Sequence, residues 1–234
     1  MTGTISPIII ALDYSHAGEA LSLARQLDPE KCKLKVGKEL FTRSGPMIIE
    51  QLHELNFDVF LDLKFHDIPN TVAGACRAAA DLGCWMINVH ASGGSKMLEA
   101  AAEAVSQSAH RPLLIAVTIL TSLDDSALRE LGFENDSTTM TQLFAKLASE
   151  AGLDGVVSSP HDIEQTKTNQ GEKFLVVTPG IRPAGSAVGD QVRIATPKSA
   201  IESGADYLVI GRPITQAENP QDALDAIISE IPST

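Results

Sequence analysis

The segment FLDLKFHDIPNT, residues 60–71, places two oppositely charged side chains two positions apart. If this segment begins as a β-strand, Asp62 and Lys64 project to one face, and Leu61 and Leu63 project to the other. Burying either ion alone is costly, whereas a lysine beside a carboxylate makes joint burial tolerable. An ammonium held among carboxylates should keep its proton, so Lys64 is a candidate proton donor rather than a Schiff-base nucleophile.

Two other apolar runs carry charges with the same alternation. Ala11 shares a face with Asp13, and Lys33 shares a face with Lys35. We therefore expect charges of both signs to converge at one end of a sheet. An inert structural ion network is the competing interpretation. It is the weaker one, because an apolar filling would be easier to stabilise.

A second group of residues is suited to binding an anion. The segments TPGIRP and IGRP each combine a glycine with an arginine, and in the second Gly211 would give backbone access beside the bidentate donor Arg212. Arg182 and Gln191 bracket the loop RPAGSAVGDQ, whose small residues suit a lid that closes over a ligand. A lone glycine indicates only a turn. The adjacent arginines favour a phosphate site.

The elements that must position these residues follow from the apolar pattern. Short β-branched runs alternate with amphipathic helical patterns along the whole chain, which is typical of a parallel sheet wrapped by helices. Strands are predicted at residues 7–13, 33–37, 59–64, 86–90, 113–118, 155–158, 174–178 and 207–211. Helices are predicted at residues 17–27, 45–55, 71–82, 95–106, 139–151, 160–170, 197–203 and 220–231.

Eight such units in 234 residues favour an α/β fold of the (β/α)8 TIM-barrel class, with residues 1–234 as one catalytic domain. An open doubly wound sheet is the alternative, but no GxGxxG motif follows the first strand. In a (β/α)8 barrel the chemistry lies where the strands end. The charged residues described above fall at those ends.

Composition and charge exclude several classes of function. The formal net charge of −12 disfavours nucleic acid as a partner. The odd number of cysteines, with no CxxC pair, indicates neither a disulfide framework nor a zinc site and fits a cytoplasmic protein. The first residues, MTGTISPIIIALDYS, do not resemble a signal peptide, and no apolar run reaches membrane-spanning length.

Several reactive residue types are expected to be structural. A single histidine on a strand or loop is more often a hydrogen-bonded structural residue than a catalyst, so His66 and His90 are left out of the chemistry. Cys76 and Cys84 fall on or just after an alanine-rich helical pattern, where they should pack as small hydrophobes.

Seven segments, taken together, resemble one enzyme family from end to end. They are ALDY, LKVGKELF, FLDLKFHDIPNT, NVHASGG, IAVTILTSL, TPGIRPAGSAVGDQ and YLVIGRPIT. In these segments the chain resembles the orotidine 5'-monophosphate decarboxylases, and DLKFHDIPNT is the most specific signature. The resemblance implies decarboxylation to uridine 5'-monophosphate, the last step of de novo UMP synthesis, with no metal and no organic cofactor.

Carried over position by position, the resemblance makes Lys64 the acid that protonates carbon six, with Asp62 against the departing carboxylate. Lys35 and Asp67 complete the charged network. Asp67 and Thr71 would reach into the site of a neighbouring subunit, which implies a homodimer. The substrate-binding residues that the resemblance implies are Asp13, Lys35, Asp62, Thr71, Thr121, Arg182, Gln191, Gly211 and Arg212.

Two other functions remain open. A metal-dependent aldolase or decarboxylase acting on a sugar phosphate could share the Asp-x-Lys-x-x-Asp pattern of residues 62–67, but its acidic metal ligand at the end of the second strand would here be Lys35. A non-catalytic module that binds nucleotide phosphates would need only the phosphate loops. Four mutually dependent charges would serve no purpose in it.

Overall fold

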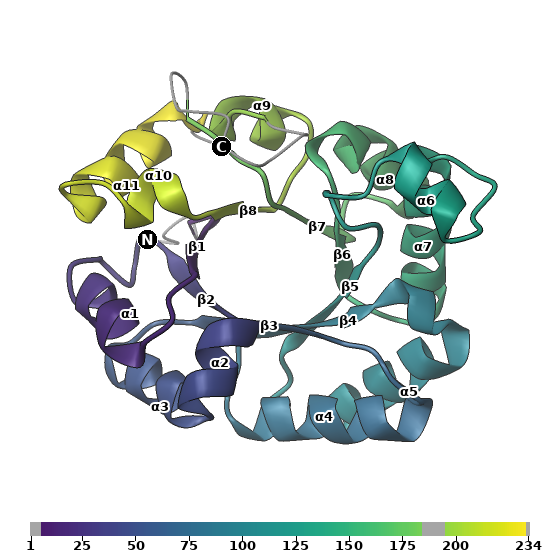
Figure 1. The fold of residues 1–234 in the computed structure, drawn as a ribbon, viewed down its shortest axis with the longest axis horizontal. Coiled ribbons are helices and arrows are strands. Elements are labelled where there is room, and N and C mark those ends of the chain that lie inside the picture. Colours follow the sequence, from purple (N-terminus) through teal and green to yellow (C-terminus); the bar gives the residue numbers. More distant parts are fainter. Residues whose placement is uncertain (1–5, 184–194, 233–234) are drawn as a thin grey trace.

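Eight parallel strands close into a barrel in which each strand pairs with the next and β1 pairs with β8 (Figure 1). The computed structural model describes residues 6–183 and 195–232. The strands are β1 (Ile8–Leu12), β2 (Lys33–Gly37), β3 (Val59–Phe65), β4 (Met86–His90), β5 (Leu113–Val117), β6 (Gly155–Val157), β7 (Leu175–Thr178) and β8 (Tyr207–Ile210). The predicted fold class is confirmed, and the predicted strand bounds agree to within one residue.

Helices surround the barrel on the outside (Figure 1). The α-helices are α1 (Ala17–Ala24), α2 (Lys38–Ser44), α3 (Met47–Glu54), α4 (Pro69–Asp81), α5 (Ser95–Ser106), α6 (Asp125–Glu130), α7 (Ser137–Glu150), α8 (Ile163–Gln170), α9 (Pro197–Glu202), α10 (Arg212–Thr215) and α11 (Pro220–Glu230). Two 3-10 turns, η1 (Ala91–Gly93) and η2 (Pro160–Asp162), precede α5 and α8. In the described part of the chain, no helix is both long and apolar enough to cross a membrane.

Three helices were not predicted from the sequence. The pattern placed one helix at 45–55, whereas α2 and α3 are separate because Gly45 between them takes a positive φ of 62°. The two other helices, α6 and α10, have six and four residues, too few for an apolar period to show. All three lie at the end of the barrel where the strands finish.

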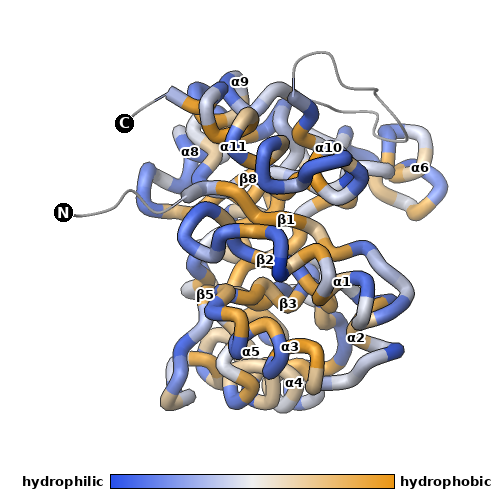
Figure 2. The backbone as a smooth tube through the Cα atoms, turned by 90° about the vertical axis from the view of Figure 1, so that its left-hand side faces the viewer, coloured by the Kyte–Doolittle hydropathy of each residue, from blue (hydrophilic) through white to orange (hydrophobic). Residues whose placement is uncertain are grey.

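Alternation along the strands gives the barrel two apolar cores. Outward residues such as Ile10, Leu12 and Leu34 are fully buried against the helices. Inward residues such as Ile9 and Phe60 form a smaller cluster inside the barrel. Figure 2 shows the resulting hydrophobic interior and the more hydrophilic outer turns. The inner cluster fills the barrel, so a ligand can enter only from an end.

One lysine lies at the opposite end of the barrel from the one expected. Lys33 faces inward, as the alternation predicts, but its ammonium lies 5.0 Å from the ring centroid of Trp85 and 5.7 Å from that of Tyr207. It also donates to the Ser6 carbonyl at 3.4 Å. These partners precede or begin their strands, so Lys33 belongs to the floor of the barrel and does not join the charges at the mouth.

Candidate active site

A cavity of about 540 Å³ opens at the end of the barrel where the strands finish. This volume falls within the range of small-molecule sites. Inward apolar residues, among them Phe60 and Val177, form part of its lining. Most of the predicted site residues also line it, namely Asp13, Lys35, Asp62, Lys64, Thr121, Arg182, Gly211 and Arg212.

Three of these side chains form a row of alternating charge across adjacent strands. The Lys35 ammonium lies 3.2 Å from Asp62 Oδ2, and the Lys64 ammonium lies 2.5 Å from Asp62 Oδ1. Lys35 is also 3.4 Å from Asp13 Oδ1. The side chains of Lys35 and Asp62 are 10% and 11% exposed, that of Lys64 is 24% exposed and that of Asp13 is 73% exposed. The row therefore runs from a buried centre to the open cavity.

The row holds its central members in their charged forms. Burial alone would raise the pKa of Asp62, but Lys35, Lys64 and the Asn88 amide lower it to about 2. For Lys35, burial lowers the pKa, and the carboxylates of Asp62 and Asp13 together raise it above its ordinary value. Each charge thus stabilises its neighbour where water is largely excluded. The result is a fixed field on one wall of the cavity.

The backbone at Lys64 departs from regular strand geometry. Its φ is +55°, in the left-handed region, and the pairing of β3 with β4 shifts register between Leu61 and Phe65. The side chain of Asn88 on β4 contacts both Lys64 and Asp62 at this irregularity. Its signal in the sequence was a polar residue inside the apolar strand MINVH. No role was predicted for Asn88 from the sequence.

The arginines of the cavity lie on the loops after β7 and β8. Arg182 is 9% exposed, and Arg212 begins α10. Among the described residues, a Cβ added to Gly211 would meet Ala11 Cβ at 3.7 Å and Asp13 Oδ2 at 3.9 Å and nothing nearer. The backbone of Gly211 is therefore open to the cavity, as phosphate binding requires.

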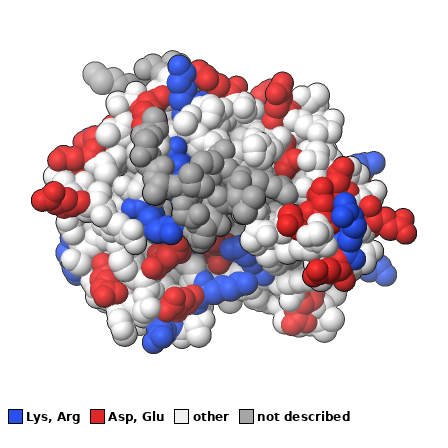
Figure 3. All heavy atoms as spheres, turned by 45° about the horizontal axis from the view of Figure 1, so that its top comes forward, with Lys and Arg blue, Asp and Glu red and all other residues white. Residues whose placement is uncertain are grey.

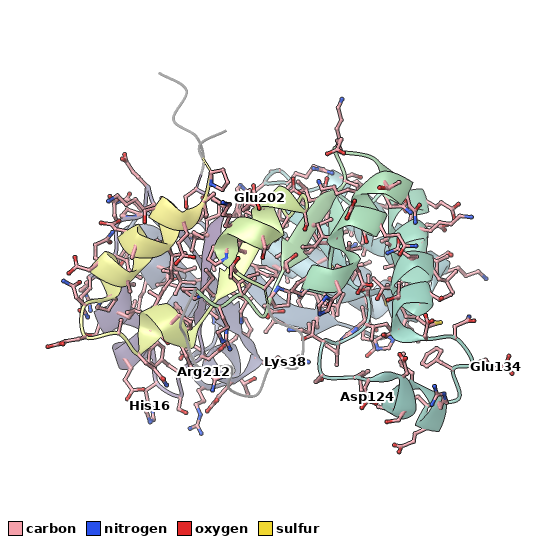
Figure 4. The ribbon with its side chains drawn as sticks, turned by 90° about the horizontal axis from the view of Figure 1, so that it is seen from above. His16, Lys38, Asp124, Glu134, Glu202 and Arg212 are labelled. Atoms are coloured by element: carbon pink, nitrogen blue, oxygen red, sulfur yellow. The ribbon has the colours of Figure 1, made fainter. Side chains whose placement is uncertain are left out.

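Figure 4 shows Arg212 and Lys38 at the same end of the barrel. With the top of the molecule forward, basic side chains lie near the centre of the face, with acidic side chains among them and around its edge (Figure 3). A local group of cations thus exists within a chain of net charge −12.

Two predicted site residues do not line this cavity. Asp67 and Thr71 belong to an exposed run from His66 to Thr71 that follows β3. Asp67 Oδ1 accepts from the Ile68 backbone N–H at 2.6 Å, and within the described ranges Asp67 forms no ion pair with the row. Gln191 and most of its loop lie outside the described residues.

Histidine and cysteine stand apart from the row. His66 and His90 face each other with ring centroids 5.5 Å apart. Burial and the neighbouring cations lower the pKa of His90 to about 4, so it is neutral at pH 7. All three cysteines are buried and unpaired, and Cys76 and Cys84 pack in the core as predicted. Over residues 6–183 and 195–232, no cluster of three His, Cys, Asp or Glu side chains could hold a metal ion.

Other lining residues were not predicted. Tyr14 follows β1 and donates its hydroxyl to the Thr215 carbonyl at 3.3 Å, which ties the first loop to α10. Gln216 and Leu120 complete the rim. They lie in loops, where no periodic pattern indicates which side chains turn toward a ligand.

Comparisons with known proteins agree over almost the whole chain. The sequence model described as "Orotidine 5'-phosphate decarboxylase / HUMPS family" matches residues 6–227. Proteins named orotidine 5'-phosphate decarboxylase from Alcanivorax borkumensis and Halorhodospira halophila are 57% and 58% identical, over 97% and 96% of this chain and 98% and 95% of theirs. The crystal structure of the protein of that name from Lactobacillus acidophilus has a TM-score of 0.88 and 40% identity, covering 97% of this chain and 100% of that one.

Proposed function

The chain belongs to the orotidine 5'-phosphate decarboxylase / HUMPS family, and from this membership we infer that it converts orotidine 5'-monophosphate to uridine 5'-monophosphate and carbon dioxide. This makes it a carboxy-lyase of pyrimidine biosynthesis. The structural observation that supports decarboxylation is the row of Lys35, Asp62 and Lys64 along one wall of the cavity.

The reaction demands electrostatic stabilisation. The bond between carbon six and its carboxylate breaks, the electron pair stays on carbon six, and carbon dioxide leaves. That pair lies in the plane of the ring and cannot delocalise into it. An ammonium fixed beside the developing charge can lower its energy without reorganising. Lys64 then gives its proton from Nζ to carbon six and regains one from solvent.

Asp62 has two roles in this proposal. It holds Lys35 and Lys64 in place, because both ammonium groups contact its carboxylate. Its pKa of about 2 keeps it ionised at neutral pH. The departing carboxylate of the substrate would lie against this charge, and the repulsion would ease its loss.

We assign the ribose, the pyrimidine ring and the phosphate of the substrate to other residues of the cavity. Asp13 and Lys35 would hold the ribose hydroxyls, and Thr121 would meet the pyrimidine ring. Arg182, Gln191, Gly211 and Arg212 would hold the phosphate. Binding energy from this remote group can orient the ring against Lys64. Leaving aside Gln191, which lies outside the described residues, all of these ribose and phosphate residues except Gly211 are charged. Such a lining is in keeping with an anionic, hydroxylated ligand.

We also propose that the enzyme is a homodimer in which Asp67 and Thr71 complete the neighbouring site. The support is their exposure, together with that of Ile68, which is 66% exposed beside them. A large apolar side chain next to an exposed carboxylate suits a contact with a second copy. Asp67 would then extend the alternating row beside Lys64 from the other subunit.

A mixing experiment tests the shared site. Lys64→Ala and Asp67→Asn should each be inactive alone, whereas a mixed dimer contains one site with both residues intact. Random reassociation of equal amounts should restore about a quarter of wild-type activity. Failure to restore activity in dimers verified by mass would reject the shared site.

The three buried, unpaired cysteines favour a reducing compartment, so we place the enzyme in the cytoplasm.

The activity is tested with purified protein, orotidine 5'-monophosphate and excess EDTA, by following loss of the orotate chromophore. Rapid loss with wild type and none with Lys64→Ala is expected. Loss only after magnesium is restored would favour the metal-dependent sugar-phosphate reaction. Tight binding of uridine 5'-monophosphate without turnover would favour the non-catalytic module.

A further inference from the structure

The irregularity between β3 and β4 lies at the catalytic row. In the pairing register, Leu61 is opposite Ile87 and Phe65 is opposite Val89. Asp62, Leu63 and Lys64 on β3 are therefore opposite one residue of β4, Asn88. Such a bulge interrupts the backbone ladder and leaves extra residues unpaired. Some other group must fix their conformation.

The side chain of Asn88 supplies what the ladder cannot. The Lys64 backbone N–H donates to Asn88 Oδ1 at 2.8 Å, and Asn88 Nδ2 donates to Asp62 Oδ1 at 2.7 Å. Asn88 is fully buried. Since a backbone N–H can only donate and an ionised carboxylate can only accept, the orientation of the amide is determined by its partners. One side chain thus holds the backbone of Lys64 and the carboxylate of Asp62.

The position of Lys64 needs this support. A non-glycine residue in the left-handed region persists only when its surroundings hold it there. Asn88 accepts the N–H of this very residue, while the Lys64 ammonium returns to the same Asp62 oxygen that Asn88 contacts. The amide therefore links both ends of the lysine, one end directly and the other through Asp62.

We propose that Asn88 is a positioning residue of the catalytic row, which holds Lys64 and Asp62 in register so that the Lys64 ammonium faces carbon six of the substrate. This assignment rests on the proposed function of Lys64 as the acid. Asn88 does not line the cavity and is not expected to touch the substrate. We therefore expect Asn88 to affect the transfer of the proton from Lys64, which kcat measures, and not the affinity for the ligand.

Residues that resemble asparagine cannot replace it. Leucine has a similar volume but would leave the Lys64 N–H and one lone pair of Asp62 without their partner. Aspartate has the same shape, but its ionised form lacks the donor and adds a like charge beside Asp62. When protonated, the introduced carboxyl regains both functions, because its O–H can donate to Asp62 while its carbonyl accepts from Lys64.

Two variants and one control test the proposal. Asn88→Leu should lower kcat about 100-fold with little change in KM, since a misplacement of about 1 Å at the reacting groups has this effect. Thr166→Val is the matched control: Thr166 is fully buried on α8, its hydroxyl donates to the Asp162 carbonyl at 2.7 Å, and it lies outside the cavity. It should lose stability and keep kcat.

Asn88→Asp gives a signature that a general loss of structure would not. The ionisable groups around this position are Asp62 and Lys64 on β3, Lys35 on β2 and His90 on the same strand, while β5 on the other side is the apolar segment LLIAV. Two adjacent carboxyl groups share a proton readily. The ratio of variant kcat to wild-type kcat should therefore rise as the pH falls from about 8 to about 5.5.

Amide hydrogen exchange at Lys64 gives a second measurement that does not depend on turnover. Exchange should be faster in Asn88→Leu than in wild type and unchanged in Thr166→Val. A kcat within about threefold of wild type in Asn88→Leu, or a pH-independent ratio in Asn88→Asp, would overturn the positioning role. If wild type itself fails to decarboxylate the substrate, the proposed function fails, and unchanged exchange at Lys64 in Asn88→Leu would still reject the tether.

Discussion

One prediction concerns Asp62, whose carboxylate contacts both ammonium groups of the row. Asp62→Asn places a neutral isostere where the protonated acid would stand, so the cost of the substitution can be worked out from the pKa. A fall from 3.8 to about 2 in the folded protein corresponds to about 2.5 kcal/mol of stability at neutral pH. We expect Asp62→Asn to lose about this amount at pH 7.

The loss should depend on pH in a defined direction. Because the folded pKa is depressed, the contribution of Asp62 is present above pH 3.8 and disappears as the pH falls through about 2. At pH 3, about half of the difference between wild type and variant, roughly 1.3 kcal/mol, should remain.

Urea unfolding followed by circular dichroism at pH 7, 5 and 3, at one fixed protein concentration, measures this difference. Asp225→Asn is the matched control, because Asp225 pairs with Lys31 at 2.9 Å on the open surface. It should change stability little. A difference for Asp62→Asn that stays constant from pH 7 to pH 3, or a variant more stable than wild type at pH 7, would refute the reasoning.

Three further predictions concern Arg212 and Gly211 in the cavity and His90 outside it. Arg212→Ala should raise KM roughly 100-fold by removing a phosphate donor, and free phosphite should partly restore turnover of a substrate without phosphate; no rescue would count against the use of phosphate binding to orient the ring. Gly211→Ala should raise KM with an unchanged Tm, because the added Cβ meets no atom of the described residues closer than 3.7 Å but enters the cavity; a lower Tm would contradict this. Because the pKa of His90 is about 4 in the folded protein and about 6.5 in the unfolded chain, the unfolded chain binds the proton at higher pH than the folded one. His90 therefore contributes to the loss of stability as the pH falls below 6.5. His90→Gln should therefore reduce the acid-side loss of stability in pH-dependent urea titrations, by roughly 1 kcal/mol after allowance for its partial exposure.

The sequence predicted those parts of the site that rest on regular strands. A two-residue period in a parallel strand separates inward from outward residues, so Asp13, Lys35 and Asp62 could be assigned to the mouth without coordinates. The same period does not say how far along the barrel a side chain lies. Lys33 and Lys35 share a face, but two residues of rise, about 7 Å, separate the barrel floor from the cavity.

Other parts depend on contacts that no local pattern records. The left-handed conformation of Lys64 follows from a bulge, and the bulge is stabilised by Asn88 from a different strand. The short helix α6 is stabilised by an N-cap, in which the Asp124 side chain accepts a hydrogen bond from the Ala127 N–H. Asp67 and Thr71 were assigned by resemblance alone, and both are exposed outside the cavity as the described residues form it.

The charge distribution accounts for how a chain of net charge −12 can take a nucleotide that carries both a phosphate and a carboxylate. At physiological ionic strength, charges more than about 8 Å apart are largely screened, so the acidic outer surface has little influence inside the cavity. There Lys35, Lys64 and the two arginines act at short range and in partial exclusion of water. In the proposed binding mode the buried Asp62 would oppose the substrate carboxylate. In the same binding mode the arginines would attract the phosphate while Asp62 would repel the substrate carboxylate, and this difference would favour the transition state over the bound substrate.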